Sequence, residues 1–343
     1  MPPAKLPEEG KTLVYSTVDN HEIKFDYWLP RTEGNLPAMI YYHGGGMTAG
    51  SRRSGGFPHW MYNHCQEKGY IFISADYRLC HPSNAIDQIE DAKALFTFLS
   101  GPSFDTQLPQ ATTLDTTRIA VSGFSAGAYS ARAACLYATP KPAALLSVYG
   151  LGGHMLLDHW TTARPPTSLA KFFDLSSVPA LLADKTVVSD DVGEGLGTKR
   201  FALTIHWEIT GTFLDGVFQR PGLGEMLNAF PVEKRFEAVP DDLKSGMLQE
   251  FVTRDYPPSV FVHGKADEVV SPAESEFQYE QLGNLGVATE LILIDNGPHG
   301  LEGPIKMRKA MGQEVEGGEK VIEDCMEAYQ KALVFIDGVF AGI

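Results

Sequence analysis

The sequence Gly-Phe-Ser-Ala-Gly at positions 123–127 is the feature that most constrains the fold of this chain. It follows a strand-like run at 118–122 and overlaps the start of a helix-like run of small residues at 126–138. Two glycines in that context allow a sharp turn, which would raise the Ser125 hydroxyl above the edge of a sheet. The N-terminus of the following helix would direct free N–H groups and a partial positive charge toward the same point. We therefore interpret Ser125 as a candidate nucleophile.

A candidate base and a candidate acid for this serine occur later in the chain. His299, the last histidine of the sequence, follows an expected strand, and Asp267 follows another, in a turn that also carries Glu268. Because functional groups gather at the carboxyl ends of the strands in open α/β sheets, we expect His299 and Asp267 to approach Ser125. The residues alone leave the acid open among Asp267, Glu268 and Asp295.

The segment after the acid has the pattern of a helix start. Ser-Pro-Ala-Glu at 271–274 matches a capping box with proline at the first helical position. This pattern predicts a helix over 272–285, with Ser271 and Glu274 closing its N-terminus.

Three consecutive glycines occur in His-Gly-Gly-Gly at 43–46, directly after an expected strand at 38–42. Glycines cost backbone entropy on folding, so an ordinary loop gains little from three of them. They do allow main-chain N–H groups to converge on one oxygen, as an oxyanion hole requires. We expect the amide groups of Gly45, Gly46 and Ala126 to form it.

With these motifs the chain resembles the α/β-hydrolase fold, in particular its hormone-sensitive-lipase-like esterases. The matching elements are His-Gly-Gly-Gly at 43–46, Asp76-Tyr77-Arg78-Leu79, Gly-x-Ser-x-Gly at 123–127, Asp267 in His-Gly-x-x-Asp, and His299. The resemblance covers residues 11–151 and 256–340. It implies that Ser125 is the nucleophile, that His299 is its general base and that Asp267 orients His299.

The chain departs from that group of esterases at two places. Phe124 and then Ala128-Tyr129 occur where the group usually has Asp and then Gly-Asn, and Cys80-His81-Pro82 replaces the common Ala-Pro-Glu. Just before the second departure, Asp76 and Arg78 are expected to form an internal ion pair or hydrogen-bond network that holds the oxyanion loop.

Strand and helix patterns alternate along most of the chain. The expected strands are 12–18, 23–29, 38–42, 70–74, 119–122, 144–149, 260–263 and 290–294, and the expected helices are 57–68, 85–99, 126–138, 272–285 and 319–339. After an initial hairpin, this order predicts a mainly parallel eight-stranded sheet with helices on both faces.

One long stretch interrupts the alternation. Residues 151–255 are rich in aromatic side chains and far exceed the length of a plain βα connection. They leave from one strand end and return to the next, which predicts an inserted helical cap over the site. The expected organisation is thus a hydrolase core in two parts, 1–150 and 256–343, with a cap at 151–255.

The composition excludes several kinds of partner. The net charge of −15 opposes binding to nucleic acid or to an anionic membrane surface. No stretch approaches the roughly 20 apolar residues of a membrane span, and no signal-peptide pattern is visible. Four unpatterned cysteines fit free thiols in a reducing compartment, so we expect a cytoplasmic protein.

We expect neither a metal nor an organic cofactor. The histidines and cysteines at 59–81 lack zinc-ligand spacing. Gly-Leu-Gly-Gly at 150–153 follows a strand, but it lacks the third glycine of a dinucleotide-binding loop.

The resemblance implies a serine carboxylester hydrolase, an esterase or lactonase that works through an acyl-enzyme. The aromatic side chains of residues 151–255 either pack the interior of the cap or, for several of them, line an apolar pocket. The second interpretation favours a small to medium hydrophobic organic ester or lactone as substrate. One alternative uses the same three residues for acyl transfer or amide cleavage. Another is a non-catalytic small-molecule receptor, which the presence of His299 disfavours. The sequence leaves the assembly open between a monomer and a homodimer.

Overall fold

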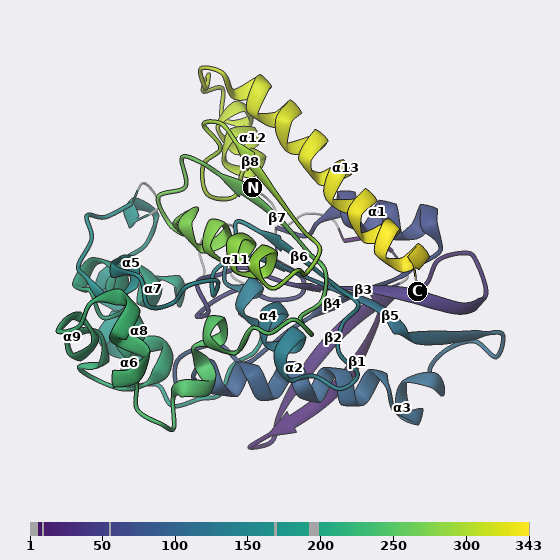
Figure 1. Ribbon diagram of the computed structural model, residues 1–343, viewed down its shortest axis with the longest axis horizontal. Helices are drawn as coiled ribbons and strands as arrows, with labels where there is room; N and C mark the ends of the chain where they lie inside the picture. Colours follow the sequence, from purple (N-terminus) through teal and green to yellow (C-terminus); the bar gives the residue numbers. More distant parts are fainter. Residues whose placement is uncertain (1–5, 9, 55, 168–169, 192–198, 343) are drawn as a thin grey trace.

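The computed structural model of the protein describes residues 6–8, 10–54, 56–167, 170–191 and 199–342. An eight-stranded sheet in the order β1-β2-β4-β3-β5-β6-β7-β8 forms its centre (Figure 1). The pairs β1–β2 and β2–β4 are antiparallel, and every other neighbouring pair is parallel. The mainly parallel eight-stranded sheet predicted from the sequence is therefore confirmed.

All eight expected strands are present. They are β1 (Lys11–Val18), β2 (His21–Trp28), β3 (Gly34–Tyr42), β4 (Ile71–Ala75), β5 (Thr112–Phe124), β6 (Ala144–Val148), β7 (Ser259–Gly264) and β8 (Thr289–Ile294). Most strand starts lie within two residues of the prediction, but β3 and β5 begin four and seven residues earlier, because their first residues pair with each other, Gly34 with Thr112 and Leu36 with Leu114. The sequence pattern revealed only the fully buried part of each strand.

The five expected helices are also present, and α3 and α12 were not predicted. Outside the 151–255 segment the helices are α1 (His59–Lys68), α2 (Ala85–Leu99), α3 (Pro102–Asp105), α4 (Gly127–Tyr137), α11 (Ala273–Asn284), α12 (Glu302–Ala310) and α13 (Gly318–Gly342). Helix α2 begins at a true capping box, since Asn84 Oδ1 accepts from the amide of Asp87 at 3.1 Å and Asp87 Oδ2 from that of Asn84 at 2.8 Å.

The capping box predicted at Ser271 and Glu274 is wrong. The Glu274 side chain is fully buried and turns away from its own helix. Its Oε2 accepts the amides of Gly152 at 2.9 Å and His154 at 2.8 Å, and its Oε1 accepts the indole N–H of Trp160. This carboxylate therefore anchors the start of the 151–255 segment to α11, a long-range partnership that outweighs the local cap.

Alternation along the strands builds two cores. In β3, Ile40 and Tyr42 point to one face of the sheet and Met39 and Tyr41 to the other. Helices α2, α4 and α11 cover the first face, and α1, α12 and α13 cover the second. Figure 1 shows α1 and α13 on the opposite side of the sheet from α2. Helices on both faces explain why the central strands are apolar along their whole length.

The segment between β6 and β7 is helical. It contains α5 (Asp158–Thr161), α6 (Val178–Ala183), α7 (Phe201–Thr210), α8 (Phe213–Phe218), α9 (Leu223–Asn228) and α10 (Arg235–Ala238), with 3₁₀ turns η1 (Ala170–Phe172), η2 (Leu175–Ser177), η3 (Val232–Lys234), η4 (Lys244–Gly246) and η5 (Leu248–Phe251). Figure 1 shows α5 to α9 gathered at one end of the molecule. We call residues 151–255 the helical insertion; its residues 168–169 and 192–198 lie outside the described part.

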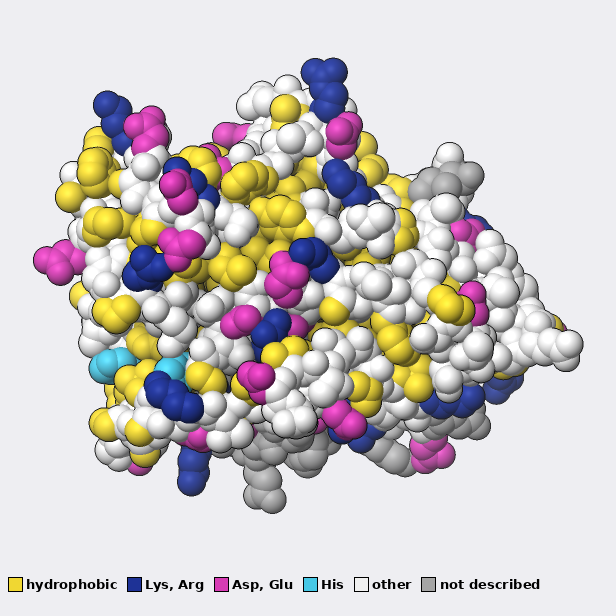
Figure 2. Space-filling view, turned by 90° about the horizontal axis from the view of Figure 1, so that it is seen from below, with side chains coloured by type: hydrophobic (Ala, Val, Ile, Leu, Met, Phe, Trp, Pro, Cys, Tyr) yellow, Lys and Arg dark blue, Asp and Glu magenta, His cyan; other side chains and the backbone are white. Residues whose placement is uncertain are grey.

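The surface mixes charges of both signs. Figure 2 shows basic and acidic side chains interspersed over one face, with apolar side chains between them, so the basic side chains form no continuous patch on that face. Within the described ranges, no helix combines the length and the apolar character that crossing a membrane requires.

Substitutions in the long C-terminal helix α13 test the packing of the second core. Replacing Ile336, which is fully buried against the sheet, by alanine should lower the free energy of unfolding by about 2–5 kcal/mol. The same truncation at Val334, which is 57% exposed on the same helix, should change it by less than about 0.5 kcal/mol. Urea unfolding of both variants measures the difference. Equal effects would show that α13 does not pack as described.

Candidate active site

Ser125 lies in a strained turn between β5 and α4. Its φ angle is +53°, in the left-handed region, which costs a non-glycine residue about 1–2 kcal/mol. Its amide donates to the carbonyl of Val148 at 3.0 Å. The following Gly127 lies against the end of β3, because an added Cβ would come within 2.2 Å of the Tyr42 oxygen and 2.4 Å of the His43 oxygen. Only glycine fits at this position, so close packing against β3 requires Gly127 in addition to the turn predicted from the sequence.

The three side chains singled out in the sequence meet at this turn. Ser125 Oγ is 2.9 Å from His299 Nε2, and His299 Nδ1 is 2.7 Å from Asp267 Oδ2. Because the carboxylate accepts, Nδ1 carries the hydrogen, and Nε2 is free to accept the serine proton. Ser125 is 9% exposed and the His299 side chain 15% exposed, so the hydrogen-bonded chain is largely shielded from water.

Four donors converge on the Asp267 carboxylate. Besides His299, the amides of Val269 and Val270 donate to its Oδ1, each at 2.9 Å. His263 Nε2, which also donates to the Val270 carbonyl at 3.1 Å, lies 3.3 Å from its Oδ2. Burial opposes ionisation, but the charge of His299 and the hydrogen bonds of both histidines hold the pKa of Asp267 well below its usual value. This carboxylate therefore stays charged.

The two alternative acids point elsewhere. Asp295 pairs with Lys265 at 2.7 Å, and the Glu268 residue is exposed to solvent. Sequence reasoning missed a different participant, His263, which is fully buried and reaches the carboxylate from the end of β7. Its signal was available, because it is the histidine of the His-Gly-x-x-Asp motif.

The glycine-rich loop lies beside the serine. Gly45 and Gly46 have φ angles of +126° and +61°, and an added Cβ on Gly44 would lie 3.2 Å from the Ser125 Cβ. Across the described residues, no protein acceptor takes the amide hydrogens of Gly45, Gly46 or Ala126. These three donors, predicted from the sequence, are thus available to an oxygen next to the serine.

The helical insertion contacts this loop directly. Thr204 of α7 donates from Oγ1 to the Gly46 carbonyl at 2.9 Å and lies 2.7 Å from Thr48 Oγ1. A Cβ on Gly46 would clash with Thr204 at 2.3 Å. The glycine at this position therefore also admits the inserted helix, a role that the sequence did not reveal.

Sequence comparisons find similarity to one family and to several known proteins. The BD-FAE family matches residues 25–144. A carboxylesterase, NlhH of Mycobacterium tuberculosis, is 34% identical over 131 residues, 37% of this chain and 38% of that protein. A non-reducing polyketide synthase, atr1 of Stereocaulon alpinum, is 24% identical over 308 residues, 84% of this chain. The chain spans only 12% of that synthase.

Solved structures extend the match to nearly the whole chain. A protein of unknown function from Staphylococcus aureus superposes with a TM-score of 0.59 at 18% identity, covering 96% of this chain and 99% of that one. A butyrate-bound thermophilic esterase of Thermogutta terrifontis has a TM-score of 0.51 at 17% identity, covering 85% of each chain. The protein has the α/β-hydrolase fold.

The Phe124 departure in this α/β-hydrolase has a packing explanation. The Phe124 ring contacts Tyr41 at 5.1 Å, Tyr149 at 5.7 Å and Trp60 at 6.0 Å between ring centroids. Tyr149 in turn lies 5.0 Å from the His299 ring. Aromatic packing thus supports both the serine turn and the histidine where related esterases usually have an aspartate.

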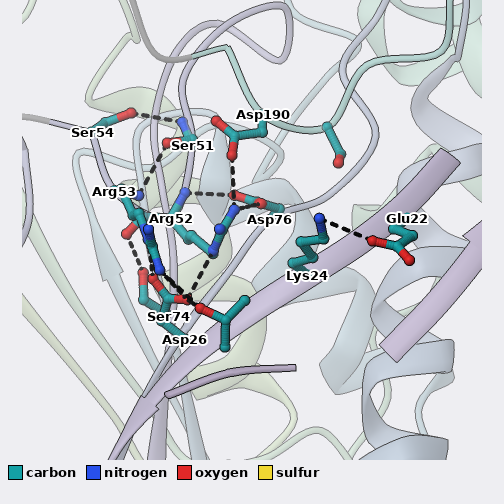
Figure 3. A network of polar contacts seen from close by, with 12 residues as sticks. Glu22, Lys24, Asp26, Ser51, Arg52, Arg53, Ser54, Ser74, Asp76 and Asp190 are labelled. Atoms are coloured by element: carbon teal, nitrogen blue, oxygen red, sulfur yellow. Dashed lines mark hydrogen bonds and ion pairs between the residues drawn. The ribbon is translucent and has the colours of Figure 1, made fainter. Parts of the chain in front are cut away.

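The loop that follows the glycines is held by a buried charge network (Figure 3). Arg52 binds Asp26 at 3.1 Å and Asp190 of the insertion at 2.9 Å, and it also pairs with Asp76. The predicted contact between Asp76 and Arg78 is therefore wrong. Arg78 binds Asp91 and Asp87 instead. The network still ties the oxyanion loop to the sheet, and it adds the insertion.

Substitution of Arg52 tests how much this network contributes to stability. Arg52→Ala leaves Asp76 buried without its cation and Asp26 with Arg53 alone, and it should lower the free energy of unfolding by about 3–5 kcal/mol. The matched change Arg220→Ala breaks an exposed pair with Asp242 and should cost at most about 1 kcal/mol. Urea unfolding compares the two variants. A loss at Arg52 no larger than that at Arg220 would contradict a structural role for the network.

Proposed function

We propose that this α/β-hydrolase is a serine carboxylester hydrolase that acts through an acyl-enzyme. The observation that carries the proposal is the continuous hydrogen-bonded chain from Ser125 through His299 to Asp267, beside three unused amide donors. Similarity to a carboxylesterase over 131 residues supports it. Both features are needed, because the chain of hydrogen bonds activates the serine and the amides stabilise the charge that its attack creates.

The first half of the reaction forms the acyl-enzyme. Ser125 Oγ attacks the ester carbonyl carbon while its proton passes to His299 Nε2, and the carbonyl electron pair moves to the oxygen. The amides of Gly45, Gly46 and Ala126 bind that oxyanion. When the intermediate collapses, the carbon–oxygen bond to the alcohol breaks, and His299 gives its proton to the departing alcohol.

The second half repeats these steps with water. His299 takes a proton from water as its oxygen attacks the acyl carbon, and collapse of the second intermediate returns the proton to Ser125 Oγ. Asp267 remains ionised throughout and stabilises the imidazolium in both halves. No group outside the three side chains and the amides is required for the balance of atoms.

A groove beside His299 supports a hydrophobic substrate. A cavity of about 550 Å³ reaches the His299 ring between the insertion and α12, with Phe172, Met307 and Met311 among its lining residues. Because His299 protonates the leaving group, we assign this groove to the alcohol part of the ester. We further propose that residues 151–255 act as the cap of the site, as the contact of Thr204 with Gly46 supports.

The state of the cysteines supports a cytoplasmic location for the protein. Cys65, Cys80, Cys135 and Cys325 are all buried and free. Buried free thiols are typical of reducing compartments, where disulfides do not persist.

Acyl transfer is the second candidate function. The similarity to a non-reducing polyketide synthase extends over 84% of the chain, although it covers only 12% of that protein. A non-water acceptor would use the same acyl-enzyme, since only the second nucleophile differs. Product analysis with competing alcohols separates the two candidates.

The nucleophile is tested by substitution. Ser125→Ala should abolish labelling by a fluorophosphonate probe and reduce aryl-ester turnover by at least about 1,000-fold. Ser130→Ala, a buried serine on the next turn of α4, is the matched control and should keep its labelling. Undiminished turnover in Ser125→Ala would overturn the mechanism, and a wild-type protein that resists labelling would favour the receptor alternative.

The substrate class is tested with a series of esters. If the groove binds an apolar alcohol, kcat/KM should rise by up to about fourfold for each added methylene until the groove is filled, because each buried CH₂ contributes about 0.8 kcal/mol. Steady-state kinetics with one acyl group and alcohols of increasing length provides the measurement. Equal turnover of short polar and long apolar alcohol esters would contradict this assignment.

A further inference from the structure

The turn that contains the Gly46 amide has a strained backbone. The Gly45 carbonyl closes this turn by accepting the amides of Thr48 at 3.1 Å and Ala49 at 3.0 Å. The two central residues, Gly46 and Met47, have φ angles of +61° and +66°, the signs that a type I′ turn requires. Glycine adopts the left-handed region freely, but a methionine is strained there. The turn therefore has a conformation that its own residues do not favour.

A second turn conformation would relieve this strain. Types I′ and II′ differ mainly by a half-rotation of the peptide between the two central residues, and type II′ needs a positive φ only at the first of them. Glycine is the preferred residue at that first position, which Gly46 occupies. Rotation of the peptide between Gly46 and Met47 would return Met47 to a negative φ and would turn the Gly46 carbonyl to the opposite side. Local backbone preference thus favours the rotated form.

The hydroxyl of Thr204 opposes this rotation. Thr204, which is fully buried in α7, donates from Oγ1 to the Gly46 carbonyl at 2.9 Å and lies 2.7 Å from Thr48 Oγ1. Because a hydroxyl has a single hydrogen, and Thr204 gives its own to the carbonyl, Thr48 is the donor to Thr204. Among the residues that the structure describes, no other donor binds the Gly46 carbonyl. Rotation of the peptide would break this bond.

Helix α7 is itself anchored to the core next to this contact. Arg200, the buried residue directly before α7, donates through Nε to the Thr48 carbonyl at 2.9 Å. Its Nη2 donates to the Cys80 carbonyl at 3.2 Å and also to the His81 carbonyl. These acceptors belong to two different loops of the hydrolase core. Thr204 therefore meets the turn from a helix whose first turn is fixed to the same loop.

From these contacts we propose that Thr204 is a positioning residue for the oxyanion hole: its hydroxyl holds the turn in the form that keeps the Gly45 and Gly46 amides aligned for the oxyanion. Both amides belong to residues of this turn, so a turn that also samples the rotated form presents them correctly for only part of the time. Thr204 exchanges no proton in the reaction. The inference deepens the proposed function and rests on it. Because Thr204 belongs to the helical insertion, the oxyanion hole is complete only when the insertion is docked.

Removing the hydroxyl should slow the chemical steps without weakening substrate binding. The oxyanion is absent from the bound ester, so misaligned donors lower kcat and kcat/KM by the same factor and leave KM unchanged. Outright loss of one donor costs about 100- to 1,000-fold in kcat. Thr204→Val keeps the shape of the side chain and leaves the donors present but less often aligned, so it should cost about 10- to 100-fold. Thr204→Ser, which keeps the hydroxyl, should remain close to the wild type.

The experiment combines aryl-ester kinetics with inhibition by an aryl trifluoromethyl ketone. Ser125 Oγ adds to the ketone carbon, its proton passes to His299, and the carbonyl electron pair becomes an alkoxide in the oxyanion hole; no group leaves. The affinity of the ketone therefore reports the alignment of the donors, which a loss of folding stability alone does not change.

The ketone should lose affinity in parallel with catalysis. In Thr204→Val its inhibition constant should rise by about the same 10- to 100-fold by which kcat/KM falls, and Thr204→Ser should restore both. The matched control is Thr210→Val. Thr210 is exposed on the same helix α7, and its hydroxyl donates to the His206 carbonyl of that helix at 2.7 Å, so this variant should follow the wild type.

The outcomes separate this inference from the proposed function. A wild type that neither hydrolyses aryl esters nor is inhibited by the ketone overturns the proposed function. An active wild type whose kcat and ketone affinity are shared by Thr204→Val overturns the role of Thr204 alone, as does a loss confined to KM or one that Thr204→Ser also shows. Should Thr204→Val not fold, Thr204→Ala replaces it, because alanine also lacks the hydroxyl and is the strongest helix former; values equal to those of the wild type then overturn the inference.

Discussion

The contact between the first turn of α4 and the end of β3 is the constraint on which the site depends. Gly127 lies so close to the carbonyl oxygens of Tyr42 and His43 that no side chain fits between them. This contact fixes the serine turn relative to the glycine-rich loop, although more than seventy residues separate them in sequence. The strain of the left-handed Ser125 is tolerated because the surrounding packing leaves the turn no alternative.

Buried charges are concentrated around this constraint, and the principal ones are paired or hydrogen-bonded. Asp267 receives four donors, Arg52 meets three carboxylates, and Glu208 faces Arg164. Burying an unpaired charge is expensive, so each cluster holds its segments in one arrangement. Arg52 joins the core to Asp190 of the insertion, and Arg164, the partner of Glu208, donates to the Glu268 carbonyl of the core. The insertion is thus connected to the site by polar contacts at two separate points, in addition to its apolar packing.

The sequence predicted the parts of the molecule that repeat a local pattern. Every strand contains a short run of apolar, β-branched or aromatic residues, so all eight were found, while the polar first residues of β3 and β5 were missed. Helix α12 has few apolar residues and was missed for the same reason. Glu274 and Asp76 were assigned local partners, because a sequence shows neighbours along the chain before it shows neighbours in space.

The sequence by itself determined the sheet, the turn at Ser125 and the order of serine, acid and histidine, because these depend on local backbone preferences and on the rule that parallel strands end at one edge. Tertiary structure alone decided which histidine supports Asp267, which partners Glu274 and Asp76 bind, and which face of the insertion meets the glycine loop. Those choices depend on distances of a few ångströms between segments far apart in the chain. Burial there makes one pairing strongly favourable and leaves its rivals in solvent.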